Sequence, residues 1–183
     1  MTRVHFNTAF EGMTEKDLHT WIMFNRKRLI GSVLFTCNNS LTSKIVRWAE
    51  NWDKKDKTAF TPSHTGSIIE YDKQLCVFDM KPPKATITSL VNYLLYTNDD
   101  YALVLRDFNL DTKMFSLNIA EHIGEFYPFI SAIRSVFTKR QSKWRQHCSE
   151  LHARTLRLCG YKFDDSFNLE CTPLELYNVL IKV

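Results

Sequence analysis

Two β-rich runs, HTGSIIEY (64–71) and LCVFDM (75–80), are separated by only three polar residues. This spacing is typical of a β-hairpin, in which the two strands lie antiparallel. The hairpin places His64 at the start of one strand and Asp79 near the end of the other. Where the strands pair, the carboxylate of Asp79 returns beside the imidazole of His64. The strongest constraint on the fold therefore also brings two titratable side chains together.

The rest of the chain indicates helices at both ends of a small sheet. Thr14 and Asp17 resemble a capping box, Gly160 suits the residue after a helix, and Thr172 with Pro173 suits a helix start. We expect further strands at 29–36 and 101–108, and helices at 14–28, 40–52, 87–95, 111–123, 127–138, 148–159 and 173–181. This inventory predicts an α+β fold with a small mixed or antiparallel sheet. Residues 1–28 are interpreted as a helical N-terminal extension of one main domain, residues 29–183.

Composition narrows the class of protein. The chain has 183 residues, of which 44% are hydrophobic and 13% aromatic, enough for one domain with a substantial core. No stretch is apolar over a bilayer-spanning length and the N-terminus lacks a signal-like apolar run, so we expect no transmembrane segment and a cytoplasmic location. The net charge of +4 is far from that of a dedicated nucleic-acid binder. Five cysteines without a CxxC pair argue against a disulfide framework or a zinc ribbon and predict free thiols.

One of these cysteines has unusual neighbours. Cys148 lies in QHCSEL at the start of a predicted amphipathic helix, among polar residues. A helix N-terminus, a nearby imidazole and freedom from apolar burial each lower the pKa of a thiol, and we expect all three at Cys148. The helix would turn Leu151, Thr155 and Leu158 to a core, and its first backbone N–H groups could hold an oxyanion.

The base and its orienting group must come from elsewhere in the chain. His64 is the best candidate, because His147, although adjacent to Cys148, points in another direction on the helix. Asp79 would orient the imidazole. Glu70 is the alternative carboxylate, but six residues along a strand put it roughly 20 Å from His64. A metal shared by Cys148, His152 and His122 lacks further ligands at a recognisable spacing, so neither a metal nor an organic cofactor is expected.

The order of several motifs resembles a known family. GSVLFTCNNSLTSKIVRW, SHTGSIIE, VFDM, YPFISAIRSVF, HCSELHARTLRLCG and TPLELY together are similar to the circularly permuted branch of the NlpC/P60 papain-like superfamily, most of all to its YiiX-like group. The resemblance covers residues 29–180 and implies a permuted papain-like fold, with a small antiparallel sheet or barrel against helices. It also implies that Cys148 is the nucleophile, His64 the general base and Asp79 the orienting acid. Ser32 after Gly31, where relatives commonly carry aspartate, and Asp79, where they often carry glutamate, depart from the pattern.

The resemblance implies a cysteine amidase or peptidase, or an acyltransferase, working through an acyl-thioester on Cys148. Its substrates would be peptides, amides or acyl lipids, and no nucleic acid is required. One alternative is a protein of this fold without turnover that binds a host or nucleic-acid partner through the basic segment 134–145. Another is a redox sensor at Cys148. The apolar side chains Tyr127, Phe129, Ile133 and Phe137 favour core packing over a substrate-binding wall.

Overall fold

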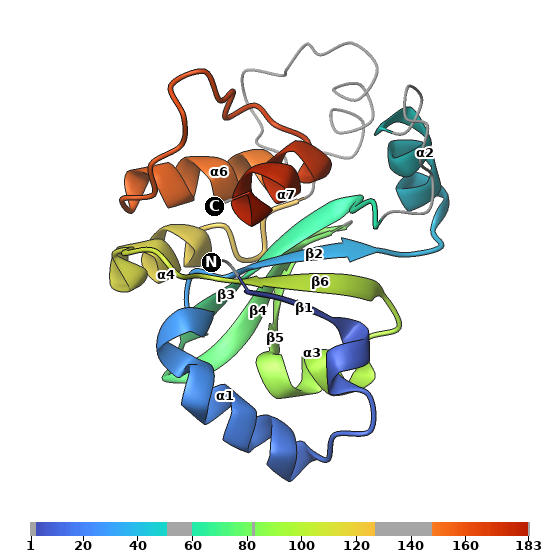
Figure 1. Cartoon of the computed structure of the whole chain (residues 1–183), viewed down its shortest axis with the longest axis vertical. Coiled ribbons are helices and arrows are strands. Elements are labelled where there is room, and N and C mark those ends of the chain that lie inside the picture. The colour runs from blue at the N-terminus through green and yellow to red at the C-terminus, as the bar shows by residue number, and fades with distance from the viewer. Residues whose placement is uncertain (1–2, 51–59, 82, 127–147, 183) are drawn as a thin grey trace.

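The fold is α+β, with one six-stranded antiparallel sheet between two layers of helices (Figure 1). The computed structural model describes residues 3–50, 60–81, 83–126 and 148–182. In Figure 1, α4, α6 and α7 lie above the sheet and α1 and α3 below it. Within the described ranges, every helix is too short or too polar to cross a bilayer.

The sheet is built around the predicted hairpin. Its strands follow the order β1-β6-β2-β3-β4-β5, and all neighbours are antiparallel. They are β1 (Arg3–Phe6), β2 (Val33–Cys37), β3 (His64–Tyr71), β4 (Gln74–Met80), β5 (Ala85–Ser89) and β6 (Asp100–Leu105). Tyr71 pairs with Gln74, and the two residues between them, Asp72 and Lys73, have φ angles of 47° and 63°. This is the left-handed two-residue turn that matches the twist of a hairpin, so the predicted hairpin is confirmed.

The helices largely follow the predicted ranges. They are η1 (Asn7–Phe10), α1 (Glu15–Leu29), α2 (Leu41–Glu50), α3 (Leu90–Tyr96), α4 (Thr112–Ala120), α6 (Cys148–Leu158) and α7 (Pro173–Ile181). The capping box at Thr14 and the cap at Thr172 are both present. Gly160, with φ of 108°, follows α6 in the left-handed region that glycine tolerates.

Two segments differ from the sequence-based assignment. Residues 87–89, expected to begin a helix, belong to β5, because the β-branched run ATITS pairs with β4 and α3 starts only at Leu90. The first residues, expected only as part of a helical extension, also form β1, which pairs with β6 at the edge of the sheet. The helix predicted over 127–138 and most of the polar loop at 53–63 lie outside the described residues.

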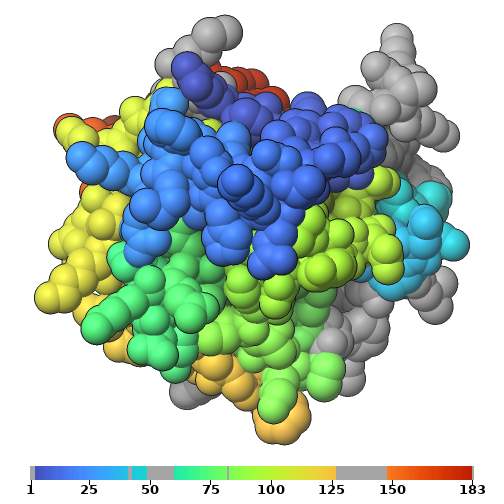
Figure 2. All heavy atoms as spheres, turned by 90° about the horizontal axis from the view of Figure 1, so that it is seen from below, coloured from blue at the N-terminus to red at the C-terminus, as the bar shows by residue number. Residues whose placement is uncertain are grey.

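Strand alternation divides the core into two layers. Phe35, Ile69 and Phe78 face the upper helices, whereas Leu34, Ile68 and Val77 face the lower ones. On the lower side, α1 buries Leu18 and Ile22, and Figure 2 shows α1 (blue) lying beside α3 across this face. Both sheet faces are therefore covered, and the ends of the strands are where polar side chains gather.

Candidate active site

His64 and Asp79 meet across the hairpin. Asp79 pairs with Gly66, and His64 lies two residues before Gly66, so the two side chains are diagonal neighbours on the same strand face. Gly66 has no side chain to separate them. The imidazole Nε2 hydrogen-bonds to Asp79 Oδ1, and both side chains are mostly buried.

Cys148, the first residue of α6, completes the chain of contacts. Its side chain hydrogen-bonds to the imidazole of His64 and to both the hydroxyl and the backbone of Thr65. Because Nε2 of His64 is occupied by Asp79, the ring nitrogen left for the thiol is Nδ1. Three residues predicted as a site from the sequence, Cys148, His64 and Asp79, thus lie together as sulfur, imidazole and carboxylate.

The three groups shift one another's pKa values in the directions that nucleophilic catalysis needs. Burial by itself raises the pKa of the Cys148 thiol, but the positive charge of His64 and the hydrogen bonds from His64 and Thr65 lower it to about 7. Burial likewise opposes the charged imidazole, yet the Cys148 thiolate and Asp79 raise the pKa of His64 to about 9. Burial disfavours the Asp79 carboxylate, and His64 and Lys81 overcome this and hold its pKa at about 2. Near pH 7 a large fraction of the thiol is therefore ionised and pairs with the imidazolium, beside an ionised carboxylate.

No protein-family model, curated protein or solved structure matches this chain.

The other four cysteines serve as an internal comparison. All five are unpaired, as predicted, and all five are buried. Burial raises the thiol pKa of each of the other four, which are Cys37, Cys76, Cys159 and Cys171. A lowered thiol pKa is therefore specific to Cys148 and does not follow from burial.

Two details of the Cys148 helix were predicted wrongly. Its thiol was expected to be free of apolar burial, but the side chain is only 3% exposed and packs in the upper core with Leu151 and Leu156. Leu158, expected in the core, is 67% exposed, because Leu156 occupies the inward position with Leu151 and Thr155.

A second histidine lies one turn from the nucleophile. His152 is fully buried, its Nδ1 donates to the backbone carbonyl of Cys148, and its Nε2 has no hydrogen-bond partner among the described residues. Burial lowers the pKa of His152 to about 4, so the ring stays neutral near pH 7 and adds no cation beside the sulfur. A metal site shared with His122 is not supported, since no group of three His, Cys, Asp or Glu side chains in the described part of the chain could hold an ion.

The alternative carboxylate lies at the opposite end of β3. Glu70 pairs with Leu75 in the hairpin and its Oε1 lies 2.6 Å from Nη2 of Arg26. It does not contact His64. The basic segment 134–145, His147 and the apolar residues Tyr127, Phe129, Ile133 and Phe137 lie outside the described residues.

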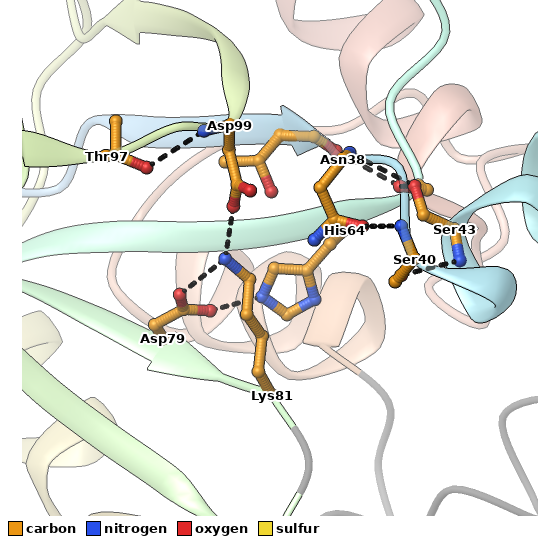
Figure 3. Close-up of polar contacts among 10 residues, drawn as sticks. Asn38, Ser40, Ser43, His64, Asp79, Lys81, Thr97 and Asp99 are labelled. Carbon is orange, nitrogen blue, oxygen red and sulfur yellow. Dashed lines mark hydrogen bonds and ion pairs between the residues drawn. The ribbon is translucent and has the colours of Figure 1, made fainter.

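Sequence reasoning missed three groups that support the site. Thr65 bonds to the thiol. Lys81 bonds to Asp79, and Asp99 bonds to Lys81 (Figure 3). A signal existed for Thr65 and Lys81, because Thr65 is adjacent to His64 and Lys81 follows Asp79 by two residues on the same face. Nothing in the sequence near Asp99 pointed to β4.

The start of β3 is anchored to the loop after β2. Ser63 donates its backbone N–H to the Thr36 carbonyl, and its hydroxyl lies 2.5 Å from that of Ser43. Asn38 closes the same loop with two hydrogen bonds. Its Oδ1 accepts from the backbone N–H of Ser40, and its own backbone N–H donates to the Ser43 hydroxyl (Figure 3). These bonds fix the backbone that carries His64.

A cavity of about 830 Å³ lies elsewhere on the molecule, lined by residues that include Arg26, Arg106, Leu110 and Gly160. None of the three site residues lines it. Cys159 lines this cavity, but burial raises the pKa of its thiol, in contrast to that of Cys148.

Proposed function

We propose that the chain is a cysteine-dependent hydrolase or acyltransferase that cleaves amides or esters of the peptide, amide or acyl-lipid classes. The single observation that supports this most is the hydrogen-bonded series Cys148–His64–Asp79, with the sulfur at the start of a helix and a lowered thiol pKa. A thiolate paired with an oriented imidazolium is the standard arrangement of a cysteine nucleophile.

The reaction follows from the protons and charges of these groups. The Cys148 thiolate attacks the acyl carbonyl, and the electron pair of the C=O bond moves to the oxygen. The oxyanion collapses, the bond to the leaving amine or alkoxide breaks, and the His64 imidazolium gives that group its proton. Neutral His64 then removes a proton from water or from a second acceptor, which attacks the thioester and regenerates the thiolate.

The start of α6 supplies a site for the oxyanion. The first N–H groups of a helix have no acceptor within the helix, and they point away from its N-terminus. Cys148 is the first residue of α6, so its own backbone N–H belongs to this set. The chemistry needs no metal or organic cofactor.

The order of the site residues along the chain also fits the family resemblance. The histidine strand precedes the cysteine helix in the chain, and α6 nevertheless packs against β3 so that sulfur and imidazole meet. We include a permuted papain-like arrangement in the proposal on that basis. No contact among the described residues favours the binding-protein alternative.

The test is to trap the acyl-enzyme. Incubation with a small activated ester, p-nitrophenyl acetate, should add one acetyl group to Cys148, detected by peptide mass spectrometry. Cys148→Ala should abolish this adduct and the associated ester hydrolysis. Cys159→Ala, a matched control that removes a buried thiol at the other end of α6, should leave both intact. Equal hydrolysis by the wild type and Cys148→Ala would overturn the proposal.

A further inference from the structure

The carboxylate that orients His64 is held on both of its oxygens. Asp79 Oδ1 accepts from His64, and Oδ2 lies 2.9 Å from the Lys81 ammonium. Lys81 Nζ also lies 2.7 Å from Asp99 Oδ2, which places the ammonium between two carboxylates (Figure 3). The chain of polar contacts therefore continues from the thiol through His64 and Asp79 to Lys81 and Asp99.

The outer part of this chain is also protected from solvent. The side chains of Asp79, Asp99 and Lys81 are 13%, 17% and 29% exposed. Buried ion pairs are weakly screened, and the loss of one partner leaves the other charge uncompensated. Among the described residues, removal of Lys81 would leave His64 as the only cation paired with Asp79, and it would remove the contact that holds Oδ2.

We propose that Lys81 is a positioning residue, whose ammonium holds the Asp79 carboxylate ionised and turned toward His64. This inference rests on the proposed function, since it describes how the base of that reaction is kept in place. Lys81 does not contact Cys148 and need not touch substrate. Its effect on the thiol passes through Asp79 and His64.

The charged and titratable groups that face His64 and Lys81 determine how the His64 titration responds to a substitution. Cys148 and Asp79 face His64 directly, and neutral His152 interacts with it from α6. Besides Asp79 and Asp99, Lys81 faces Tyr93 from α3. Burial raises the pKa of Tyr93, so its phenol stays protonated and adds no charge below the alkaline range.

Positioning and simple charge removal make opposite predictions for His64. Without repositioning, loss of a nearby cation makes the imidazolium easier to form, so its pKa would rise. If Lys81 positions Asp79, its loss weakens the hydrogen bond to Nε2, and the pKa of His64 falls from about 9 toward 6.5. A purely structural tie between β4 and the loop at Asp99 would change stability but leave the titration in place.

The experiment follows the His64 ring by NMR as a function of pH in the full-length protein. We expect the Lys81→Met midpoint to fall by at least one unit, and the rate at which Cys148 reacts with dipyridyl disulfide at pH 7 to fall severalfold. Lys81→Arg, which keeps a cation, should restore most of both values. Lys84→Met removes an exposed lysine three residues away and should leave them unchanged.

An unchanged or raised His64 midpoint in Lys81→Met would overturn the inference. If Lys81→Met does not fold, Asp99→Asn tests the same series of polar contacts. Lys81 then loses one of the two carboxylates that fix its ammonium, and its contact with Asp79 weakens. The His64 titration midpoint is then expected to fall by less than in Lys81→Met, and an unchanged midpoint overturns the inference. If wild-type Cys148 reacts equally with or without His64, the proposed function fails, which is a result distinct from any failure at Lys81.

Discussion

Replacement of His64 by alanine should change the reactivity of Cys148 in opposite directions at low and high pH. In the wild type the imidazolium holds the pKa of the thiol at about 7, against an ordinary value of 9.0. Without His64 the thiol returns to 9.0 or above, since burial is then opposed only by the Thr65 bonds. Two effects follow, one on the amount of thiolate and one on its nucleophilicity.

Both effects can be worked out for reaction with a small disulfide at pH 7. Half of the wild-type thiol is ionised at pH 7, against about 1% for a thiol of pKa 9, which is a loss of about 50-fold. The more basic thiolate is intrinsically faster by about eightfold, from a Brønsted slope of about 0.45 over two units. The variant should therefore react about sixfold more slowly at pH 7, and faster than the wild type above about pH 8.

The assay is the rate of reaction with dipyridyl disulfide between pH 5 and pH 10, with mass spectrometry to assign the modified cysteine. His19→Ala removes an exposed histidine on α1 and should reproduce the wild-type profile. Crossing of the wild-type and His64→Ala profiles is the signature of an ion pair. Profiles that coincide, or that differ by one constant factor at every pH, would refute the electrostatic reasoning.

Three further predictions concern neighbours of the pair. Asp79→Asn should destabilise the fold more at pH 6 than at pH 2. The folded state lowers the pKa of the Asp79 carboxyl from 3.8 to about 2, so the carboxylate stabilises the fold above pH 3.8 and loses this contribution as the pH falls through 2. The difference, about 2 kcal/mol in the free energy of unfolding by urea, should be absent if Asp79 is unpaired. Gly66→Ala places a Cβ 2.8 Å from the Phe78 carbonyl oxygen. We expect the free energy of unfolding, measured in urea, to fall by about 1–3 kcal/mol and the pH midpoint of Cys148 reactivity to rise. An unchanged urea concentration at half-unfolding would contradict the close approach. Thr65→Val removes the hydrogen bond from the hydroxyl to the thiolate and should raise the pH midpoint of Cys148 reactivity by about one pH unit. Thr65→Ser retains the hydroxyl and should retain the wild-type midpoint. Equal midpoints in the two variants would show that the hydroxyl is not a donor.

Local sequence patterns predicted the central hairpin and most of the helices. The short polar connection predicted the hairpin, and a hairpin returns its second strand along the first, so Asp79 could be expected near His64. The register was not predicted, because Gln74, expected in the connection, pairs with Tyr71 and leaves a two-residue turn. The capping box at Thr14 and the cap at Thr172 marked two helix starts because their bonds form within four residues. Such features depend on neighbouring residues and are readable from sequence.

Long-range features were not readable in the same way. The edge strand β1 forms because β6, about 100 residues later, offers a partner, and a run of four residues is too short for Val4 and Phe6 to predict a strand by themselves. Asp99 reaches Lys81 because the antiparallel pairing of four strands puts the start of β6 and the end of β4 at the same end of the sheet. The burial of Cys148 depends on how α6 packs against β3, and its polar sequence neighbours pointed the other way.

The activated thiol is better understood as a property of the hairpin than of the helix. Four buried cysteines show that burial in this fold raises a thiol pKa, and Cys148 is buried as fully as they are. What differs is the set of groups around its sulfur, which come from the adjacent positions 64 and 65 of β3, with Asp79 of β4 behind the imidazole. The helix brings the sulfur, and the hairpin brings the charge that makes the sulfur reactive. A change that shifts the register of β3 against β4 by even one residue would turn Asp79 to the other face, so the chemistry depends on the same pairing that defines the fold.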